Sequence, residues 1–178
     1  MPDVELRVIL SGSRTIGWTL VGFATCPSHA DGDRLTKPSE QNYRVPTSIL
    51  ETVVYCSDLV AAGEFYEKVV GLKLLSHEPN RHRFYQLAGG MLLIFRAETT
   101  EHSTVKIGGQ TIPKHGARGP GHLAFALDQE QYEAVRQRLS NCNVPIEAEI
   151  DWPTGGRSIY CRDPAGNSIE FATRNLWF

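Results

Sequence analysis

The chain has 178 residues, of which 41% are hydrophobic, and this is enough for one domain with a sizeable core. Its formal net charge is −2 and it has no basic stripe, which argues against nucleic acid and membrane surfaces as partners. No apolar run approaches the roughly 20 residues that a membrane-spanning helix needs.

The first 46 residues are interpreted as an N-terminal extension that is disordered or weakly ordered: a folded cap, a tail or an extended translation start. Residues 26–48 are rich in Pro and Ser and also contain Asp and Gly, a composition that buries little surface. The stretch Val8–Ala24 lacks the compact core and small-residue cleavage site of a signal peptide. The four cysteines form no Cys-x-x-Cys pair, so we expect reduced thiols and a cytoplasmic protein.

From Thr47 onward the hydrophobic pattern becomes regular. Ile49–Cys56 is rich in β-branched residues and predicts a strand. Ser57 or Asp58 caps a helix with apolar positions at helical spacing, and Gly71 ends it. Three further strands are expected, over Lys73–Ser76, Arg83–Leu87 and Met91–Arg96.

A long polar connection, Ala97–Gly121, separates this half from a second copy of the pattern. His122–Leu127 predicts a strand and Asp128–Ser140 a helix. The strands that follow are predicted over Val144–Glu149, Arg157–Arg162 and Asn167–Thr173. The order βαβββ therefore occurs twice, in about residues 47–98 and 121–174, which predicts one α+β domain over residues 47–175.

Residue alternation assigns the two faces of these strands. In the second copy the large side chains of Leu123, Phe125 and Leu127 share one face, while His122 and two alanines share the other. The same rule puts Glu170 on the hollowed face of the last strand. Glu51 shares a face with Val53 and Tyr55 in the first copy.

Glu51, His122 and Glu170 are thus candidate metal ligands between the two halves. Taken singly, each is better explained as a residue on a solvated sheet face or as a satisfied histidine. Three ligand-type residues at matching places in a repeat favour a metal site, because two unpartnered carboxylates would be costly to bury.

Four segments resemble the vicinal oxygen chelate superfamily, which includes glyoxalase I, extradiol dioxygenases, fosfomycin-resistance enzymes and bleomycin-binding proteins. They are the strand that starts at Glu51 and reaches Asp58-Leu59, then Phe65–Leu72, Gly121–Phe125 and Asp163–Phe171. The resemblance implies two βαβββ modules whose mixed sheets curl into a cup around one divalent metal ion. It also implies a homodimer that binds a small molecule.

The resemblance carries the ligand positions onto Glu51, His122 and Glu170. The family usually has His or Gln where this chain has Glu51, and glyoxalase-like members have a Glu near the position of Leu93. One imidazole and two carboxylates form a hard ligand set, so Mn, Ni, Zn or Mg is favoured over Fe(II). Open metal positions would suit a substrate that binds through two adjacent oxygens.

We therefore expect a metal-dependent, glyoxalase-like lyase or isomerase in which Glu170 or Glu51 moves a proton. The alternatives are an extradiol-type ring-cleaving dioxygenase and a metal-free binding protein of the drug-resistance type. His115 and Arg118, in the Gly-rich connection, are candidates for clamping an anionic substrate. Arg157 and Tyr160, which follow Gly155-Gly156, are further candidates for substrate binding; loop, core or surface roles are equally compatible with these four residues.

Overall fold

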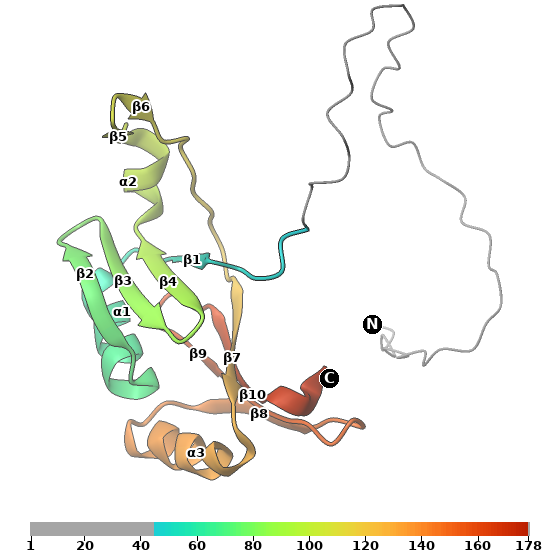
Figure 1. Cartoon of the computed structure of the whole chain (residues 1–178). Helices are drawn as coiled ribbons and strands as arrows, with labels where there is room; N and C mark the ends of the chain where they lie inside the picture. The colour runs from blue at the N-terminus through green and yellow to red at the C-terminus, as the bar shows by residue number, and fades with distance from the viewer. Residues whose placement is uncertain (1–44, 178) are drawn as a thin grey trace, which may run out of the picture. The chain divides into compact units, whose positions relative to one another are not determined.

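A computed structural model describes residues 45–177 (Figure 1). The expected N-terminal extension, residues 1–46, lies outside this range except for its last two positions. Among the described residues, no helix has both the length and the apolar character that crossing a membrane requires.

The first module has the predicted βαβββ order. It consists of β1 (Glu51–Tyr55), α1 (Leu59–Glu64), β2 (Lys73–Glu78), β3 (His82–Leu87) and β4 (Gly90–Phe95). The sheet order is β1-β4-β3-β2, with β1 parallel to β4 and the other pairs antiparallel.

The helix of this module begins and ends at the residues that the sequence indicates. The Asp58 side chain accepts hydrogen bonds from the backbone N–H groups of Val60 and Ala61, which satisfies donors that have no partner inside the helix. α1 continues into a π-helical turn, Phe65–Val70, and Gly71 ends it with a φ of 87°. Only glycine adopts this left-handed conformation without steric cost.

Gly71→Ala is expected to lower the free energy of unfolding by about 1 kcal/mol, because the new Cβ would sit in a strained left-handed residue. Gly89→Ala is the matched control, since a Cβ there meets nothing within 4 Å. Urea denaturation of both variants measures the difference. Equal midpoints would contradict the strain argument.

The second module repeats this topology. It consists of β7 (His122–Leu127), α3 (Tyr132–Asn141), β8 (Ile146–Asp151), β9 (Arg157–Arg162) and β10 (Ser168–Thr173), with short 3₁₀ turns at Gln129–Gln131 and Arg174–Leu176. The sheet order is β7-β10-β9-β8, and β7 is parallel to β10. The prediction of an α+β fold built from two βαβββ modules is confirmed.

The connection between the modules is more ordered than the sequence interpretation expected. It contains a helix, α2 (Ala97–His102), and a two-stranded hairpin, β5 (Lys106–Ile107) and β6 (Gln110–Thr111). Gly108 and Gly109 form the hairpin turn with φ values of 57° and 83°, the geometry that favours Gly-Gly in a two-residue turn. The interpretation of this segment as an irregular loop was wrong at these elements.

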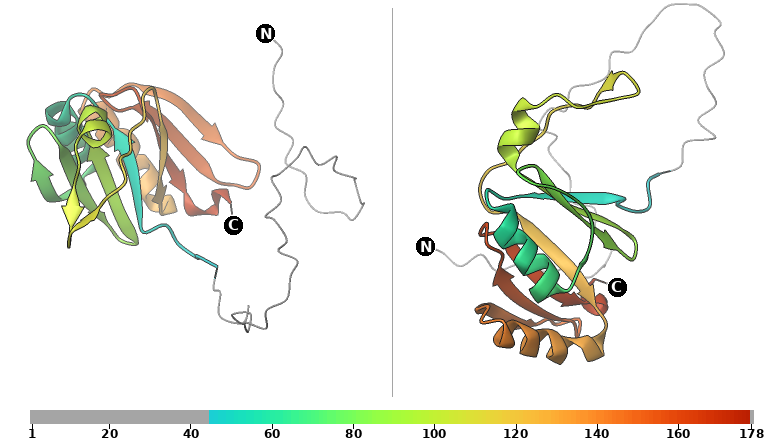
Figure 2. Two further views of the ribbon diagram at one scale, coloured as in Figure 1. Left: turned by 90° about the horizontal axis from the view of Figure 1, so that it is seen from above. Right: turned by 90° about the vertical axis from the view of Figure 1, so that its left-hand side faces the viewer.

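The two modules lie side by side and contact each other (Figure 2). The Tyr66 hydroxyl donates a 2.9 Å hydrogen bond to Oδ2 of Asp163, which is buried in the turn before β10. The Arg138 guanidinium of α3 donates to the backbone carbonyl of Val69 at 2.6 Å. Polar contacts thus join the helix of each module to the other module.

One face of each sheet packs into the common core and the opposite face is open. Leu123, Phe125 and Leu127 of β7 belong to this core or pack against it, whereas His122, Ala124 and Ala126 are exposed. The predicted division into a bulky face and a hollowed face is confirmed for this strand. The three candidate metal ligands, Glu51, His122 and Glu170, lie on the strands of these two sheets.

Candidate functional site

Glu170 lies in the middle of β10, between β7 and β9, and is only 5% exposed. The Ser158 hydroxyl on β9 donates a 2.6 Å hydrogen bond to Glu170 Oε1. Ser158 in turn accepts a 2.9 Å hydrogen bond from Trp152 Nε1. Because a buried carboxylate is stable only with such partners, this chain fixes Glu170 in one orientation.

His122 approaches Glu170 from β7. Its Nε2 lies 3.3 Å from Glu170 Oε2, and its side chain is 53% exposed. The Tyr160 ring stacks on the imidazole, with ring centroids 6.3 Å apart. Burial, followed by a hydrogen bond to Glu170, raises the pKa of Tyr160 to about 12. Tyr160 therefore keeps its proton at neutral pH.

The separation of the His122 and Glu170 ligand atoms suits a divalent ion. Two ligands with metal bonds of about 2.1 Å lie roughly 3.0 Å apart at an octahedral angle and roughly 3.4 Å apart at a tetrahedral angle. The observed distance of 3.3 Å falls between these values. The distance between the two side chains is therefore compatible with two ligands of one ion.

Glu51 stands apart from this pair, on β1 of the first sheet. It lines a cavity together with Val53, Tyr55 and Leu93, which confirms the predicted face of β1. Within residues 45–177, no three His, Cys, Asp or Glu side chains lie close enough to hold a metal ion. A single copy of the described chain therefore offers two of the three expected ligands together.

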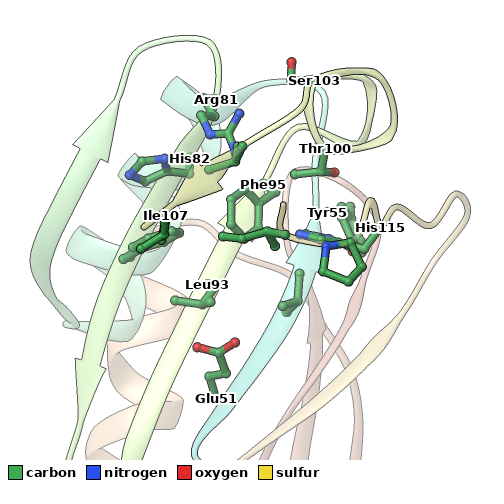
Figure 3. Close-up of a pocket in the computed structure, with 15 residues that line it drawn as sticks. Glu51, Tyr55, Arg81, His82, Leu93, Phe95, Thr100, Ser103, Ile107 and His115 are labelled. Atoms are coloured by element: carbon green, nitrogen blue, oxygen red, sulfur yellow. The ribbon is translucent and has the colours of Figure 1, made fainter. Parts of the chain in front are cut away.

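The cavity at Glu51 has a volume of about 710 Å³ (Figure 3), a typical size for a small-molecule site. Its floor is the open face of the first sheet, and the inter-module connection forms the opposite wall. His115 of this connection lines the cavity, and its Nδ1 lies 2.7 Å from the Tyr55 hydroxyl. Burial, and after it the charge of Glu101, raises the pKa of Tyr55, so the phenol is neutral.

The two arginine candidates, Arg118 and Arg157, form ion pairs outside this cavity. Arg118 contacts Glu98 at 3.3 Å and Glu101 at 2.6 Å, which ties the connection to α2. Arg157 contacts carboxylates of Asp151 and Glu133, and its guanidinium carbon lies 3.7 Å from the centroid of the Tyr132 ring. The structure thus places Tyr160 beside the His122–Glu170 pair and His115 in the cavity.

Two features of the site were not predicted from the sequence. The hydrogen-bonded chain from Trp152 through Ser158 to Glu170 was not expected, although strand alternation puts Ser158 and Tyr160 on the same face of β9, where Tyr160 is in register with Glu170. Arg81 and His82 also line the cavity. They follow a turn at Pro79-Asn80, and nothing in their spacing signals a site.

Ser158→Ala is expected to lower the free energy of unfolding by about 2 to 3 kcal/mol, because it leaves Glu170 Oε1 and Trp152 Nε1 without their buried partner. Ser140→Ala, on the exposed side of α3, should change it by less than about 0.5 kcal/mol. Chemical denaturation compares the two. A similar small effect at both positions would show that the chain of hydrogen bonds contributes little.

A family model described as the Glyoxalase/Bleomycin resistance protein/Dioxygenase superfamily matches residues 48–171. The chain belongs to this superfamily. The glyoxalase superfamily generally uses a divalent metal and binds small molecules.

Several glyoxalase-superfamily proteins are similar to the chain. The crystal structure of lactoylglutathione lyase from Agrobacterium tumefaciens is 36% identical, covers 75% of this chain and 98% of its own, and superposes with a TM-score of 0.70. Lactoylglutathione lyase from Escherichia coli O157:H7 is 28% identical over 128 residues, which are 68% of this chain and 89% of the relative. A fosfomycin resistance protein from Listeria monocytogenes shares the fold alone, at 18% identity over 72% of this chain and 94% of its own, with a TM-score of 0.54.

Proposed function

We propose that this protein is a metal-dependent, glyoxalase-like enzyme of lyase or isomerase type that acts on a small substrate through two adjacent oxygens. The observation that carries the proposal is the His122–Glu170 pair, at 3.3 Å on the open face of the second sheet. The similarity to proteins named lactoylglutathione lyase supports a lyase.

The third ligand in this proposal is Glu51 from a second copy of the chain. Glu51 is exposed and points into a cavity of the first sheet, whereas His122 is exposed on the second. Glu51 at the start of β1 and His122 at the start of β7 are both exposed, and the inter-module connection covers part of the first sheet's open face. A homodimer that sets the first sheet of one copy against the second sheet of its partner would complete the site twice.

The metal ion, when bound, would act as a Lewis acid toward the two substrate oxygens. Glu51 is the better proton carrier of the two candidates. Glu170 is buried and already accepts a hydrogen bond from Ser158. Glu51 is exposed and makes no side-chain hydrogen bond to any residue in 45–177, so a carboxylate oxygen remains free to take a substrate proton.

A metal-free binding protein is the second candidate. The observation that favours it is the separation of Glu51 from the other two ligands within one copy. In that case the cavity would bind its ligand equally well before and after treatment with a chelator. The two candidates therefore differ in measurable metal content and in the effect of chelation.

Subunit mixing tests the proposed site directly. Glu51→Gln and His122→Gln variants should each lose high-affinity binding of Mn²⁺, Ni²⁺ or Zn²⁺. If the site is shared, a heterodimer of the two variants holds one intact site and one doubly damaged site. Co-refolded mixtures should then regain about one metal ion per heterodimer, measured by isothermal titration calorimetry.

The outcome separates three arrangements. Metal binding by the mixture but by neither variant supports the shared site. No recovery in a mixture that forms dimers excludes it, and a chain that binds no metal as wild type overturns the proposed enzyme in favour of the metal-free binding protein. Arg136→Gln, a substitution on the exposed side of α3, controls for effects of refolding.

A further inference from the structure

The cavity of the first module has a charge at each end and an apolar middle. Figure 3 shows Glu51 at one end and Arg81, with Ser103, at the other. Between them the lining is mostly apolar and aromatic: Val53, Phe84, Leu93, Phe95, Val105, Ile107, Ile112 and Pro113. A ligand that fills this space must therefore match an apolar body and two different ends.

The apolar part is lined by aromatic rings in fixed orientations. His82 stacks on Phe84 with centroids 4.0 Å apart, and Phe84 meets Phe95 edge to face at 5.2 Å. Phe95 in turn meets His115 edge to face at 5.2 Å. Such a wall presents both ring faces and ring edges to a ligand, an arrangement that favours a flat aromatic body over a flexible aliphatic one.

Arg81 supplies positive charge at its end of the cavity. Among residues 45–177 its guanidinium makes no hydrogen bond, and its ion pair with the exposed Glu78 is long, at 3.7 Å. The neighbouring His82 does not share this role, because burial lowers its pKa, an effect that the charges of Arg81 and His77 reinforce and that of Glu78 opposes. The guanidinium is therefore available to a ligand.

The backbone holds Arg81 at this place. Its N–H donates to the Glu78 carbonyl at 3.0 Å in the turn between β2 and β3. Its own carbonyl accepts a 3.0 Å hydrogen bond from the N–H of Arg96, just after β4. The Arg81 main chain is thus tied to both neighbouring strands before any ligand binds, which limits the ordering cost of binding.

We propose that this cavity binds an aromatic compound with an anionic group, its ring against Phe84 and Phe95 and its anion on Arg81. The carboxylate of Glu51 repels a second negative charge. The end of the ligand near Glu51 is therefore neutral, and it carries the two adjacent oxygens of the proposed substrate. This inference rests on the proposed function in taking the cavity as the substrate site, but it concerns ligand class and can be measured without a reaction.

Three small probes separate the contributions of ring and charge. trans-Cinnamate has the flat ring and a carboxylate, cinnamamide keeps the ring without the charge, and crotonate keeps the carboxylate without the ring. Calorimetric titration of full-length, chelator-treated protein should show cinnamate binding about tenfold to 100-fold more tightly than cinnamamide, because a charge-assisted contact is lost. Crotonate should bind at least about tenfold more weakly than cinnamate.

Substitutions test which residues cause the preference for the carboxylate and for the aromatic ring. Arg81→Gln should bring cinnamate and cinnamamide to within about twofold of each other, while Arg81→Lys keeps a preference for the acid. Phe84→Leu should weaken cinnamate more than crotonate. Arg136→Gln removes a positive charge outside the cavity and should leave all three affinities within about twofold of wild type.

The proposal is overturned if cinnamate and cinnamamide bind equally to the wild type, or if Arg81→Gln retains the preference for the acid. It is also overturned if no probe binds, the result expected when another part of the chain or a second copy fills the cavity. Chelator-treated protein contains no metal, so failure of metal binding alone overturns only the proposed function, and failure of probe binding alone overturns only this inference.

Discussion

His122→Ala is expected to lower the affinity for divalent metal by at least about 100-fold while the protein stays folded. Loss of an outer contact to a metal ligand typically costs 10-fold to 100-fold, and removal of a ligand itself costs more. The His122 side chain is 53% exposed, and within residues 45–177 its one polar side-chain contact is with Glu170. Calorimetric titration with the metal ion measures the affinity. Circular dichroism shows whether the variant is folded.

His102→Ala is the matched control, because the His102 side chain is 78% exposed at the end of α2. It should bind metal as the wild type does. If His122→Ala kept wild-type metal affinity, the His122–Glu170 pair would be an ordinary ion pair and not a metal centre. Loss of both metal binding and fold would instead place His122 among the structural residues.

Asp163→Ala is expected to lower the free energy of unfolding by about 3 kcal/mol or more. Asp163 is 5% exposed and accepts hydrogen bonds from Tyr66, from the backbone N–H groups of Ala165 and Asn167, and from the Asn167 side chain. Each hydrogen bond to a buried charged group contributes about 1.5 to 3 kcal/mol, and its removal leaves the donors unsatisfied. Urea denaturation at neutral pH measures the loss.

Two further substitutions test whether the loss of stability comes from the buried hydrogen bonds of Asp163. Tyr66→Phe removes one of these hydrogen bonds and should cost about 1 to 2 kcal/mol. Asp151→Ala, where the side chain is 85% exposed, should cost less than about 1 kcal/mol. If Asp163→Ala were no more harmful than Asp151→Ala, the turn before β10 would not hold the modules together.

The sequence was sufficient to predict the duplicated fold, because each module carries its own local signals. Asp58 caps the first helix, Gly71 ends it, and the alternation of large and small residues on β7 gives the buried face. These signals act over a few residues and need no tertiary information. The predicted strand His122–Leu127 coincides with β7 for the same reason.

The arrangement of the site was harder to predict, because it depends on which sheet faces which. Alternation correctly put Glu51 on the open face of β1, but it carries no information on the distance from β1 to β7. Arg81 lines the cavity because of the path of the turn that precedes it. In this turn Asn80, a non-glycine residue, has a φ of 67°. The helix α2 was missed because its start lacks a side-chain cap and its residues are mostly polar.

The position of β10 makes the two sides of the candidate site unequal in rigidity. β10 is hydrogen-bonded to β7 on one side and to β9 on the other, so its amide protons should exchange with deuterium only when the whole module unfolds. The hairpin of β5 and β6 has exposed residues, and among the described strands these two pair only with each other. Its amides should exchange through local opening. The His122–Glu170 pair would then keep the same position in every complex. The cavity wall that carries His115 would move to fit ligands of different length.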